Sequence, residues 1–414
     1  MHYLYNIAIK ATDLLLPLAG RYNEKLGKFS QGRKGLFESL AAQIAPTDKT
    51  IWIHAASLGE YEQAVPVIIK LKELFPTHKI VLSFFSPSGF EVKKNNSLAH
   101  VVTYLPLDTP ANAEKFLNIV HPDWALFIKY EFWPNFLKEL KKRDLRSLLI
   151  SGAFRENQVF FKSYGKWMRK YLKAFEFFFV QNERSKQLLQ QIGFDNCSVS
   201  GDTRFDRVYA QLQQDNHLDF VEEFVGDHLC IVAGSTWPED EDLIIDFIHR
   251  NHNEVKVIIA PHAIKPEKIK SLQSKLEEDS LLFSEKEGKT LKDANVLIID
   301  TVGLLTKIYS YAHIAYVGGA AGNTGLHNIL EPAAFGVPVV IGQNFEKFPE
   351  AGKLKEAGGL FSVKNSAEAN EILDKLISDR DFREKAGENS VAFIEKNKGA
   401  TNKIYNYFLK NKEK

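Results

Sequence analysis

A glutamate stands where a predicted strand gives way to a predicted helix, in a position suited to proton transfer. Residues 51–54 are apolar and strand-forming, and a loop of small residues separates them from Glu60. A carboxylate in the first turn of a helix is stabilised as the anion, so Glu60 could accept a proton from a substrate. The alternative, a glutamate that only complements the helix dipole, stays open on the local sequence.

Charged side chains also follow the predicted strand at 125–128. Lys129 ends this apolar segment, and Glu131 comes two residues later. An amine is unusual at the end of so apolar a strand. This position favours an anionic ligand from outside the chain as its partner. The alternative is an ion pair between Lys129 and Glu131.

An arginine follows the last predicted strand of the first half. Arg204 stands in the segment 201–206, at the border of the first domain. Its planar guanidinium can donate two parallel hydrogen bonds to a carboxylate or a phosphate, which a lysine amine cannot. The alternative is an ion pair with Asp202 or Asp206.

The second half contains a glycine-rich loop, residues 318–325, before a predicted helix at 328–335. Bare backbone N–H groups, with Gly319 among them, are typical of a phosphate site. Glu331 would lie inside the helix and could accept two ribose hydroxyls. The loop matches neither a Walker A nor a GxGxxG pattern, which removes the main support for an ATPase or a dehydrogenase.

Two further strand ends, at 260–262 and 300–303, would line the same nucleotide cleft. No Asp-x-Asp motif occurs at a strand end. Asp240 and Asp242 belong to an acidic helix start and are interpreted as capping charge. The pattern therefore predicts a nucleotide site without a metal ion.

These residues must be positioned by α/β domains, because short apolar strands alternate with helical patterns along the whole chain. The alternation pauses at 206–226, which we interpret as a hinge between two doubly wound Rossmann-like domains that face each other across a cleft. In such sheets ligands bind beyond the carboxyl ends of the strands. The predicted strands are 51–54, 80–85, 101–105, 125–129, 147–150, 177–180, 198–201, 229–234, 255–260, 296–300, 314–317 and 338–341, and the predicted helices include 60–74, 135–142, 240–250, 302–311 and 328–335.

Composition narrows the class of protein. The chain has 414 residues, a formal net charge of +1 and two cysteines. The balanced charge gives no support for a nucleic-acid partner, and scarce cysteine excludes a disulfide scaffold and a thiolate zinc site. Residues 1–20 are apolar but contain Lys10, Asp13 and Pro17, which predicts neither a cleavable signal peptide nor a good spanning helix.

Two segments have the pattern of a membrane-surface contact. For the N-terminal segment the alternative is a helix packed on its own domain, and for 155–175 it is a core-facing helix. The first apolar face comprises Leu4, Ile7, Ala8, Ala11, Leu14, Leu15 and Leu18, followed by Arg21, Lys25, Lys28, Arg33 and Lys34. The second comprises Phe160, Phe161, Tyr164, Trp167, Met168, Tyr171, Leu172 and Phe175, beside Lys162, Lys166, Arg169, Lys170 and Lys173.

Taken together, these segments resemble the 3-deoxy-D-manno-octulosonic acid (Kdo) transferases of lipopolysaccharide assembly, glycosyltransferase family 30. The shared motifs run in the same order along nearly the whole chain: 54–60, Glu131-x-Trp133-Pro134-Asn135, 201–206, the His262 loop, and Gly318-Gly319 through Asn328-x-x-Glu331. The resemblance implies a GT-B fold. Its parts would be a membrane-associated segment at 1–40, an acceptor-binding domain at 41–210 and a CMP-Kdo-binding domain at 211–414.

The resemblance also implies an activity: inverting transfer of Kdo from CMP-Kdo to the lipid A precursor (lipid IVA), without a metal or a cofactor. The enzyme would act at the cytoplasmic face of the inner membrane, as a peripheral or N-terminally anchored protein. Glu60 matches the family's proton acceptor, and Arg204 its basic transition-state stabiliser. The residues that match its CMP contacts are Pro261, His262, Val302, Gly303, Leu304, Asn328, Ile329, Leu330 and Glu331.

The chain departs from the family pattern at three places. One is Gly325-Leu326-His327-Asn328, where the family has a Gly-Gly-His-Asn run. Lys129 stands where the family often has a glutamate, so Lys129 or Glu131 could have taken over that role. The family's Pro-Arg-His is Ala260-Pro261-His262 here, without the arginine. Two other functions stay open: another GT-B enzyme such as a nucleotide-sugar epimerase, and a non-catalytic membrane-bound scaffold that keeps a nucleotide pocket.

Overall fold

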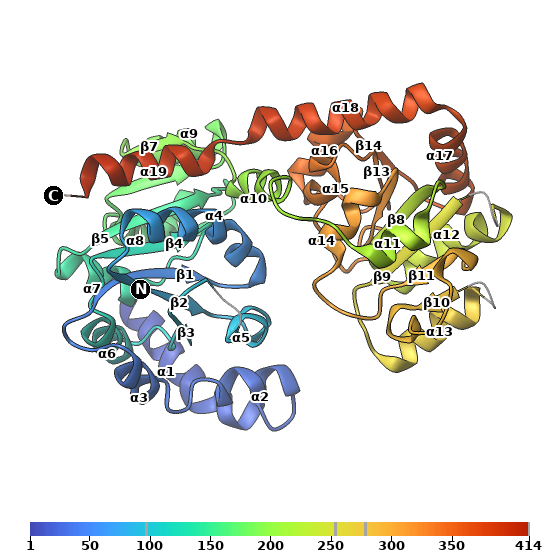
Figure 1. Cartoon of the computed structure of the whole chain (residues 1–414). Helices are drawn as coiled ribbons and strands as arrows, with labels where there is room; N and C mark the ends of the chain where they lie inside the picture. Colours follow the sequence, from blue (N-terminus) through green and yellow to red (C-terminus); the bar gives the residue numbers. More distant parts are fainter. Residues whose placement is uncertain (96–97, 252–254, 277–279, 413–414) are drawn as a thin grey trace. The chain divides into compact units, whose positions relative to one another are not determined.

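The computed structural model describes residues 1–95, 98–251, 255–276 and 280–412 (Figure 1). The described chain forms two compact units, one of residues 1–207 with 398–414 and one of residues 208–397. Within these residues, each unit is built on its own seven-stranded sheet, and all neighbouring strands are parallel.

The first sheet has the strand order β3-β2-β1-β4-β5-β6-β7. The order reverses between β1 and β4, so the carboxyl ends of these strands flank the topological switch point, where ligands bind in open α/β sheets. The strands are β1 (Lys49–Ala55), β2 (His78–Phe84), β3 (Val101–Tyr104), β4 (Trp124–Ile128), β5 (Arg146–Gly152), β6 (Phe177–Val180) and β7 (Cys197–Val199). The helices are α1 (His2–Ala19), α2 (Glu24–Gln31), α3 (Leu36–Gln43), α4 (Leu58–Leu74), α5 (Pro87–Lys93), α6 (Pro110–Val120), α7 (Pro134–Lys142), α8 (Lys166–Leu172), α9 (Glu183–Gln191), α10 (Thr203–Gln211) and α19 (Ala400–Asn411).

Strand β1 shows why the first sheet is covered on both faces. Trp52 belongs to one core cluster, where its ring lies 4.9 Å from that of Phe116 in α6. Its neighbours Ile51 and Ile53 belong to a second cluster, together with Ile68 of α4. Successive side chains of a strand point to opposite faces, so an apolar run without alternation is buried on both.

The second sheet has the strand order β10-β11-β9-β8-β12-β13-β14, and its switch point lies between β8 and β12. The strands are β8 (Leu229–Thr236), β9 (Val255–Pro261), β10 (Ser280–Leu282), β11 (Val296–Ile298), β12 (Ile314–Val317), β13 (Val339–Ile341) and β14 (Leu360–Ser362). The helices are α11 (Asp219–Val225), α12 (Pro238–Arg250), α13 (Pro266–Leu276), α14 (Leu305–Ile308), α15 (Leu330–Ala334), α16 (Pro349–Glu356), α17 (Ser366–Ser378) and α18 (Arg380–Asn397).

The C-terminal helix α19 belongs to the first unit, whereas the sequence had placed it in the segment 211–414. Phe408 is buried in the core of the first unit, where its ring lies 4.7 Å from that of Trp124. The start of α19 is held by Asp206, which accepts the N–H groups of Gly399 (2.6 Å) and Thr401 (3.0 Å). Buried aromatic contacts therefore decide which sheet this helix covers.

The structure departs from the predicted elements at short segments. β10 and β14, three residues each, were not predicted. The helix predicted at 302–311 begins as α14 at Leu305, because Gly303 adopts a φ of +94° that ends regular structure before it. The helix predicted at 328–335 is the shorter α15.

Candidate active site

Glu60 stands at the switch point of the first sheet. Helix α4 begins just after β1, with Ser57 as its N-cap, so Glu60 lies in the first helical turn. Glu60 is only 8 % exposed, and its carboxylate accepts a hydrogen bond from the Ser57 hydroxyl. A carboxylate that binds one hydroxyl at a helix N-terminus keeps lone pairs for a substrate proton.

The carboxyl end of β4 brings a second acidic group to the same point. Glu131 accepts a hydrogen bond from the indole N–H of Trp133 (3.1 Å), which also points to Nε2 of His54 (3.1 Å). His54 lies in β1 and is wholly buried, and its Nε2 is 3.5 Å from the Glu131 carboxylate. These three side chains therefore join the ends of the two strands that flank the switch point.

The hydrogen bonds of His54 define its tautomer. Nε2 faces the indole N–H of Trp133, so Nε2 is the acceptor and Nδ1 carries the proton. Nδ1 lies 3.2 Å from the carbonyl oxygen of Ser83 and 2.9 Å from its hydroxyl. The His54 ring thus supports the indole that holds Glu131. Sequence reasoning gave neither ring a role, and its one available signal was a histidine inside an apolar strand.

Lys129 directly follows β4 and has a left-handed backbone conformation, with a φ of 71°. This region is uncommon for a residue with a side chain and is found at functional sites. Its amine lies 5.2 Å from the centre of the Tyr130 ring. Among the residues that the structure describes, no ion pair joins Lys129 to Glu131. An anionic partner from outside the chain stays a prediction for this lysine.

Arg204 forms an ion pair with Asp202, which was the alternative to a role in binding a ligand. Its Nε and Nη2 donate to one oxygen of Asp202, at 2.9 and 2.8 Å. Gln63 of α4 donates to the other oxygen at 3.0 Å, so Arg204 is fixed to the helix that carries Glu60. Burial alone would raise the pKa of the Asp202 carboxyl, but the charge and hydrogen bonds of Arg204 outweigh it and lower this pKa.

In the second unit, a buried carboxylate binds the backbone of the glycine-rich loop after β12. The N–H groups of Gly319 and Ala321 donate to the Asp240 carboxylate, at 2.7 and 3.2 Å. Contrary to our expectation, the N–H of Gly319 is therefore engaged within the protein and is not free for a phosphate. Glycine is still required there, because φ is +96° and a Cβ would lie 2.1 Å from the carbonyl oxygen of Gly325.

Three rings connect the end of β9 with this loop. The ring of His262 stacks on that of Trp237, with 4.6 Å between centroids, and lies 4.5 Å from that of His327. The indole N–H of Trp237 donates to Nε2 of His327 at 3.3 Å. Burial, and secondly the nearby His262, lower the pKa of His327 to about 4, so its ring is neutral at neutral pH.

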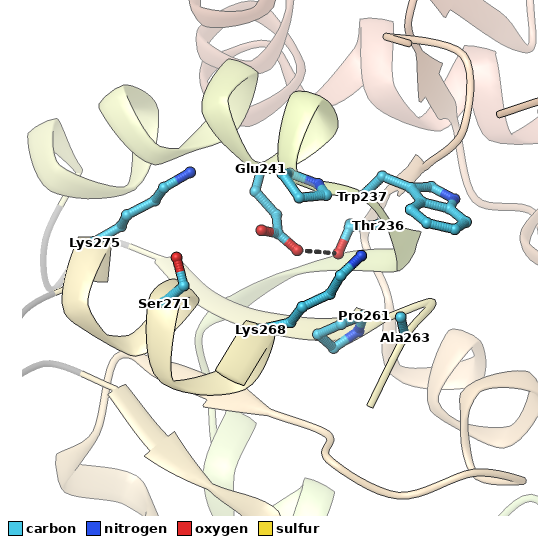
Figure 2. Close-up of a pocket in the computed structure, with 9 residues that line it drawn as sticks. Thr236, Trp237, Glu241, Pro261, Ala263, Lys268, Ser271 and Lys275 are labelled. Carbon is cyan, nitrogen blue, oxygen red and sulfur yellow. Dashed lines mark hydrogen bonds between the residues drawn. The ribbon is translucent and has the colours of Figure 1, made fainter. Parts of the chain in front are cut away.

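A cavity of about 50 Å³ opens beside the Trp237 ring (Figure 2). In it the Glu241 carboxyl accepts a hydrogen bond from the Thr236 hydroxyl (3.1 Å), and burial raises the pKa of this carboxyl. The cavity is far smaller than the roughly 150 Å³ that accommodates benzene, so it has no room for a nucleotide. Its lining residues are Thr236, Trp237, Pro238, Glu241, Pro261, Ala263, Lys268, Ser271 and Lys275.

Glu331 joins two of the segments predicted to contact CMP. Its carboxylate accepts hydrogen bonds from the Thr306 hydroxyl (2.9 Å) and the Asn328 amide (3.0 Å). Thr306 closely follows the segment 302–304, and Asn328 precedes α15. The structure therefore brings 302–304 and 328–331 together, and the His262–His327 contact adds the third predicted segment.

Helix α1 is attached to the first unit near its start. Tyr5 donates its hydroxyl proton to Asp108 (2.7 Å), and Asn6 accepts from the Asn135 amide (2.9 Å). Asp108 is buried and also accepts the N–H groups of Asn135 and Phe136, at 3.0 Å each. The seven apolar residues of the predicted stripe are all exposed, so of the two alternatives the structure favours a face that does not pack on its own domain.

We expect Tyr5→Phe to loosen α1, because it removes one hydrogen bond to a buried carboxylate, worth about 1.5–3 kcal/mol. Amide hydrogen exchange should accelerate in α1 and the free energy of unfolding should fall by about that amount. Tyr3→Phe is the matched control, since Tyr3 is 77 % exposed on the same helix. Equal exchange and stability in the two variants would contradict the role of Tyr5.

The other predicted membrane segment, 155–175, packs mainly inside. It is not one helix but two 3-10 turns, Val159–Phe161 and Ser163–Gly165, followed by α8. A Cβ at Gly165 would lie 1.5 Å from the Val159 carbonyl oxygen, so only glycine allows this tight turn. Of the predicted stripe, Phe160, Tyr171, Leu172 and Phe175 are buried in the core, Phe161, Trp167 and Met168 pack against it, and Tyr164 is exposed.

Arg33, predicted among the cations after the N-terminal helix, is also turned inward. Its guanidinium donates to the carbonyl oxygens of Leu105 (2.9 Å) and Phe85 (2.8 Å). Burial lowers its pKa to about 9. Arg33 therefore holds the chain that follows α2 against the first sheet. Within the described residues, no helix has the length and hydropathy that a transmembrane segment requires.

The chain matches two protein-family models. Residues 21–207 match 3-deoxy-D-manno-octulosonic-acid transferase (kdotransferase), and residues 242–392 match glycosyl transferases group 1. The first match contains Glu60, Glu131 and Arg204. The second contains His262, the glycine-rich loop and Glu331.

Curated relatives cover most of the chain. The 3-deoxy-D-manno-octulosonic acid transferase of Haemophilus influenzae is 26 % identical over 413 residues, which are 94 % of this chain and 92 % of that protein. The enzyme of the same name from Chlamydia trachomatis serovar A is 29 % identical over 371 residues, 86 % of this chain and 83 % of that protein. A bifunctional glycosyltransferase/methyltransferase of Fusobacterium nucleatum is 26 % identical over 363 residues. That match spans 85 % of this chain but only 56 % of the relative.

Solved structures share the fold. UDP-GlcNAc 2-epimerase from Neisseria meningitidis has a TM-score of 0.60 at 18 % identity, over 88 % of this chain and 100 % of that chain. A glycosyltransferase from Rickettsia africae has a TM-score of 0.57 at 15 % identity, with the same coverage. The predicted fold class, two parallel-sheet α/β domains of the GT-B type, is confirmed. In its family match over residues 21–207 and in its relatives, this chain is similar to the 3-deoxy-D-manno-octulosonic acid transferases.

Proposed function

We propose that this protein transfers Kdo from CMP-Kdo to the lipid A precursor, with inversion at the anomeric carbon and without a metal ion. The observation that carries the proposal is Glu60, a buried carboxylate in the first turn of α4 at the switch point of the first sheet. A transferase needs a group that takes the proton of the attacking hydroxyl, and Glu60 has the chemistry and the place for it.

In this mechanism, the oxygen of an acceptor hydroxyl forms a bond to the anomeric carbon of Kdo. The bond from that carbon to the CMP phosphate oxygen breaks, and the hydroxyl proton passes to Glu60. The transition state has oxocarbenium character, as in other glycosyl chemistry. Glu60 accepts a hydrogen bond from Ser57, which orients its carboxylate before the acceptor arrives.

Arg204 and Lys129 supply positive charge for the donor. Negative charge grows on the phosphate oxygen as CMP leaves, and Kdo itself carries a carboxylate. A guanidinium held by Asp202 is already oriented, so it stabilises this charge without reorganisation. Lys129 has an amine without an ion-pair partner among the described residues, and Glu131, two residues later, accepts a hydrogen bond from Trp133.

The second unit would bind the CMP part of the donor. The segments 261–262 and 302–304 follow β9 and β11 at the carboxyl edge of the second sheet, and 328–331 follows the loop after β12, which flanks the switch point. The Glu331 carboxylate, supported by Thr306 and Asn328, suits two ribose hydroxyls. Among the described residues, no three His, Cys, Asp or Glu side chains are grouped as metal ligands.

The exposed apolar face of α1 supports an enzyme that works on the cytoplasmic surface of the inner membrane. An apolar helix face followed by cations binds an anionic leaflet. Here the face is turned to solvent, while Tyr5 and Asn6 hold the helix to the unit that carries Glu60. The lipid acceptor and the membrane would then be met on the same unit.

The proposal is tested by incubating the protein with CMP-Kdo and a tetraacylated lipid A precursor in EDTA, followed by mass spectrometry of the lipid. We expect adducts of one or more Kdo masses. Epimerisation of a nucleotide-sugar without any lipid product would instead favour the GT-B epimerase alternative, and a folded protein without either activity would favour the scaffold.

A further inference from the structure

A buried aspartate lies beneath the glycine-rich loop of the second unit. Asp240 is in the first turn of α12 and is wholly buried. One oxygen accepts the N–H groups of Trp237 (3.0 Å) and Gly319 (2.7 Å). The other accepts the Tyr316 hydroxyl (3.0 Å) and the N–H of Ala321 (3.2 Å). Four hydrogen-bond donors therefore surround one carboxylate. A carboxylate that only caps a helix does not need so many.

These donors come from two places in the chain. Trp237 belongs to the turn between β8 and α12, whereas Gly319 and Ala321 belong to the loop after β12. β8 and β12 are the strands that flank the switch point of the second sheet. The carboxylate thus joins the two turns that border the position where ligands bind in such sheets.

The loop continues this connection toward the candidate donor residues. The N–H of Gly325 donates to the carbonyl of Gly319 (3.1 Å), and the N–H of His327 donates to that of Gly318 (3.1 Å). A Cβ at Gly318 would lie 2.9 Å from a carboxylate oxygen of Asp240, so the backbone rests directly on it. Asn328 comes next in the chain and holds Glu331. These hydrogen bonds therefore link Asp240 through the loop to Asn328 and Glu331.

We propose that Asp240 is a positioning residue for the nucleotide donor, which it serves by fixing the loop 318–325 so that His327, Asn328 and Glu331 are presented to CMP. This inference rests on the proposed function. Asp240 makes no contact with the donor itself in this scheme. Its carboxylate occupies the N–H groups of Gly319 and Ala321, so these two groups shape the loop instead of binding the phosphate.

Asp240→Asn tests the inference, because the amide keeps the volume of the side chain but can accept at one atom only. One of the two loop N–H groups then loses its acceptor or meets a competing donor. We expect the Kd for CMP, measured by isothermal titration with the full chain, to rise about tenfold or more, since a hydrogen bond to a charged group is worth at least that factor. The KM for CMP-Kdo should rise by a similar factor, and kcat should change less.

Asp242→Asn is the matched control, because Asp242 lies on the same helix but is exposed and pairs with Lys275. It should bind CMP as the wild type does. Tyr316→Phe removes one donor to Asp240 and should weaken CMP binding by a smaller factor, and this variant decides the matter if Asp240→Asn does not fold. CMP binding unchanged in the folded variants, with the wild type binding CMP, would overturn the role of Asp240 alone. A wild type that does not bind CMP would overturn the proposed function and this inference with it.

Discussion

We expect Glu60→Gln to lower the kcat of Kdo transfer by about 10²–10⁴-fold, the range that general base catalysis contributes. Glutamine keeps the length of the side chain and can still accept the hydrogen bond from Ser57. It cannot take a proton from the attacking hydroxyl. The affinity for CMP should stay unchanged, because the candidate CMP residues belong to the second unit.

The measurement is the initial rate of lipid product formation at saturating CMP-Kdo, with Glu62→Gln as the control. Glu62 lies on the same helix and pairs with Arg207, so it tests the loss of one negative charge without the loss of the base. A full rate in Glu60→Gln would leave the transferase function in place but remove Glu60 as the base. Glu131, at the end of β4, would then be the next carboxylate to substitute.

The positions of Glu60 and Glu131 could be predicted from sequence because each follows a long apolar strand. Residues 51–53 and 125–128 form continuous apolar runs, and such runs are typical of parallel strands covered on both faces. The pairing of β1 with β4 then places both carboxylates at one switch point. The local sequence pattern and the strand order both indicate the carboxyl edge of the first sheet. The positions of these two carboxylates could therefore be predicted without knowledge of contacts between distant residues.

The contacts that hold the site could not be predicted, because they join residues far apart in the chain. The hydrogen bond between Trp133 and His54 spans 79 residues, and so does that between Gly319 and Asp240. From sequence, Asp240 is one of several acids at a helix start, where capping charge is the ordinary interpretation. Its burial and its four donors exist only in the folded chain.

The sequence also does not determine whether the apolar face of an amphipathic segment is exposed or buried. Periodicity identifies an apolar face but not whether that face meets the core or the solvent. The apolar stripe of α1 is exposed, whereas most of the aromatic stripe at 155–175 is buried. The second segment is broken into short turns at Gly165, and its aromatic side chains then join the core of the first unit.

Arg204→Lys should lower kcat by about 10²-fold, within the range found when one preorganised donor to a developing charge is removed. Lysine keeps the positive charge but replaces a planar fork, which donates twice to Asp202, by a flexible amine. The same rate assay measures this change. Arg207→Lys is the control, because Arg207 lies on the same helix and pairs with the more exposed Glu62. A full rate in Arg204→Lys would show that charge alone is sufficient at this position.

The pH dependence of the free energy of unfolding distinguishes the contribution of Arg204 to stability from its proposed contribution to Kdo transfer. The pKa of the Asp202 carboxyl is lowered in the folded protein, so the stabilisation by this ion pair is fully present above the ordinary pKa of aspartate and is lost as the pH falls through the lowered value. In Arg204→Ala, the remaining burial of Asp202 should raise that pKa instead. The free energy of unfolding, measured with urea, should therefore fall most at neutral pH, and the difference from the wild type should shrink in acid. An equal difference at all pH values would contradict the pairing, while a loss of kcat at a pH where both proteins are folded would assign the remaining effect to the transfer step.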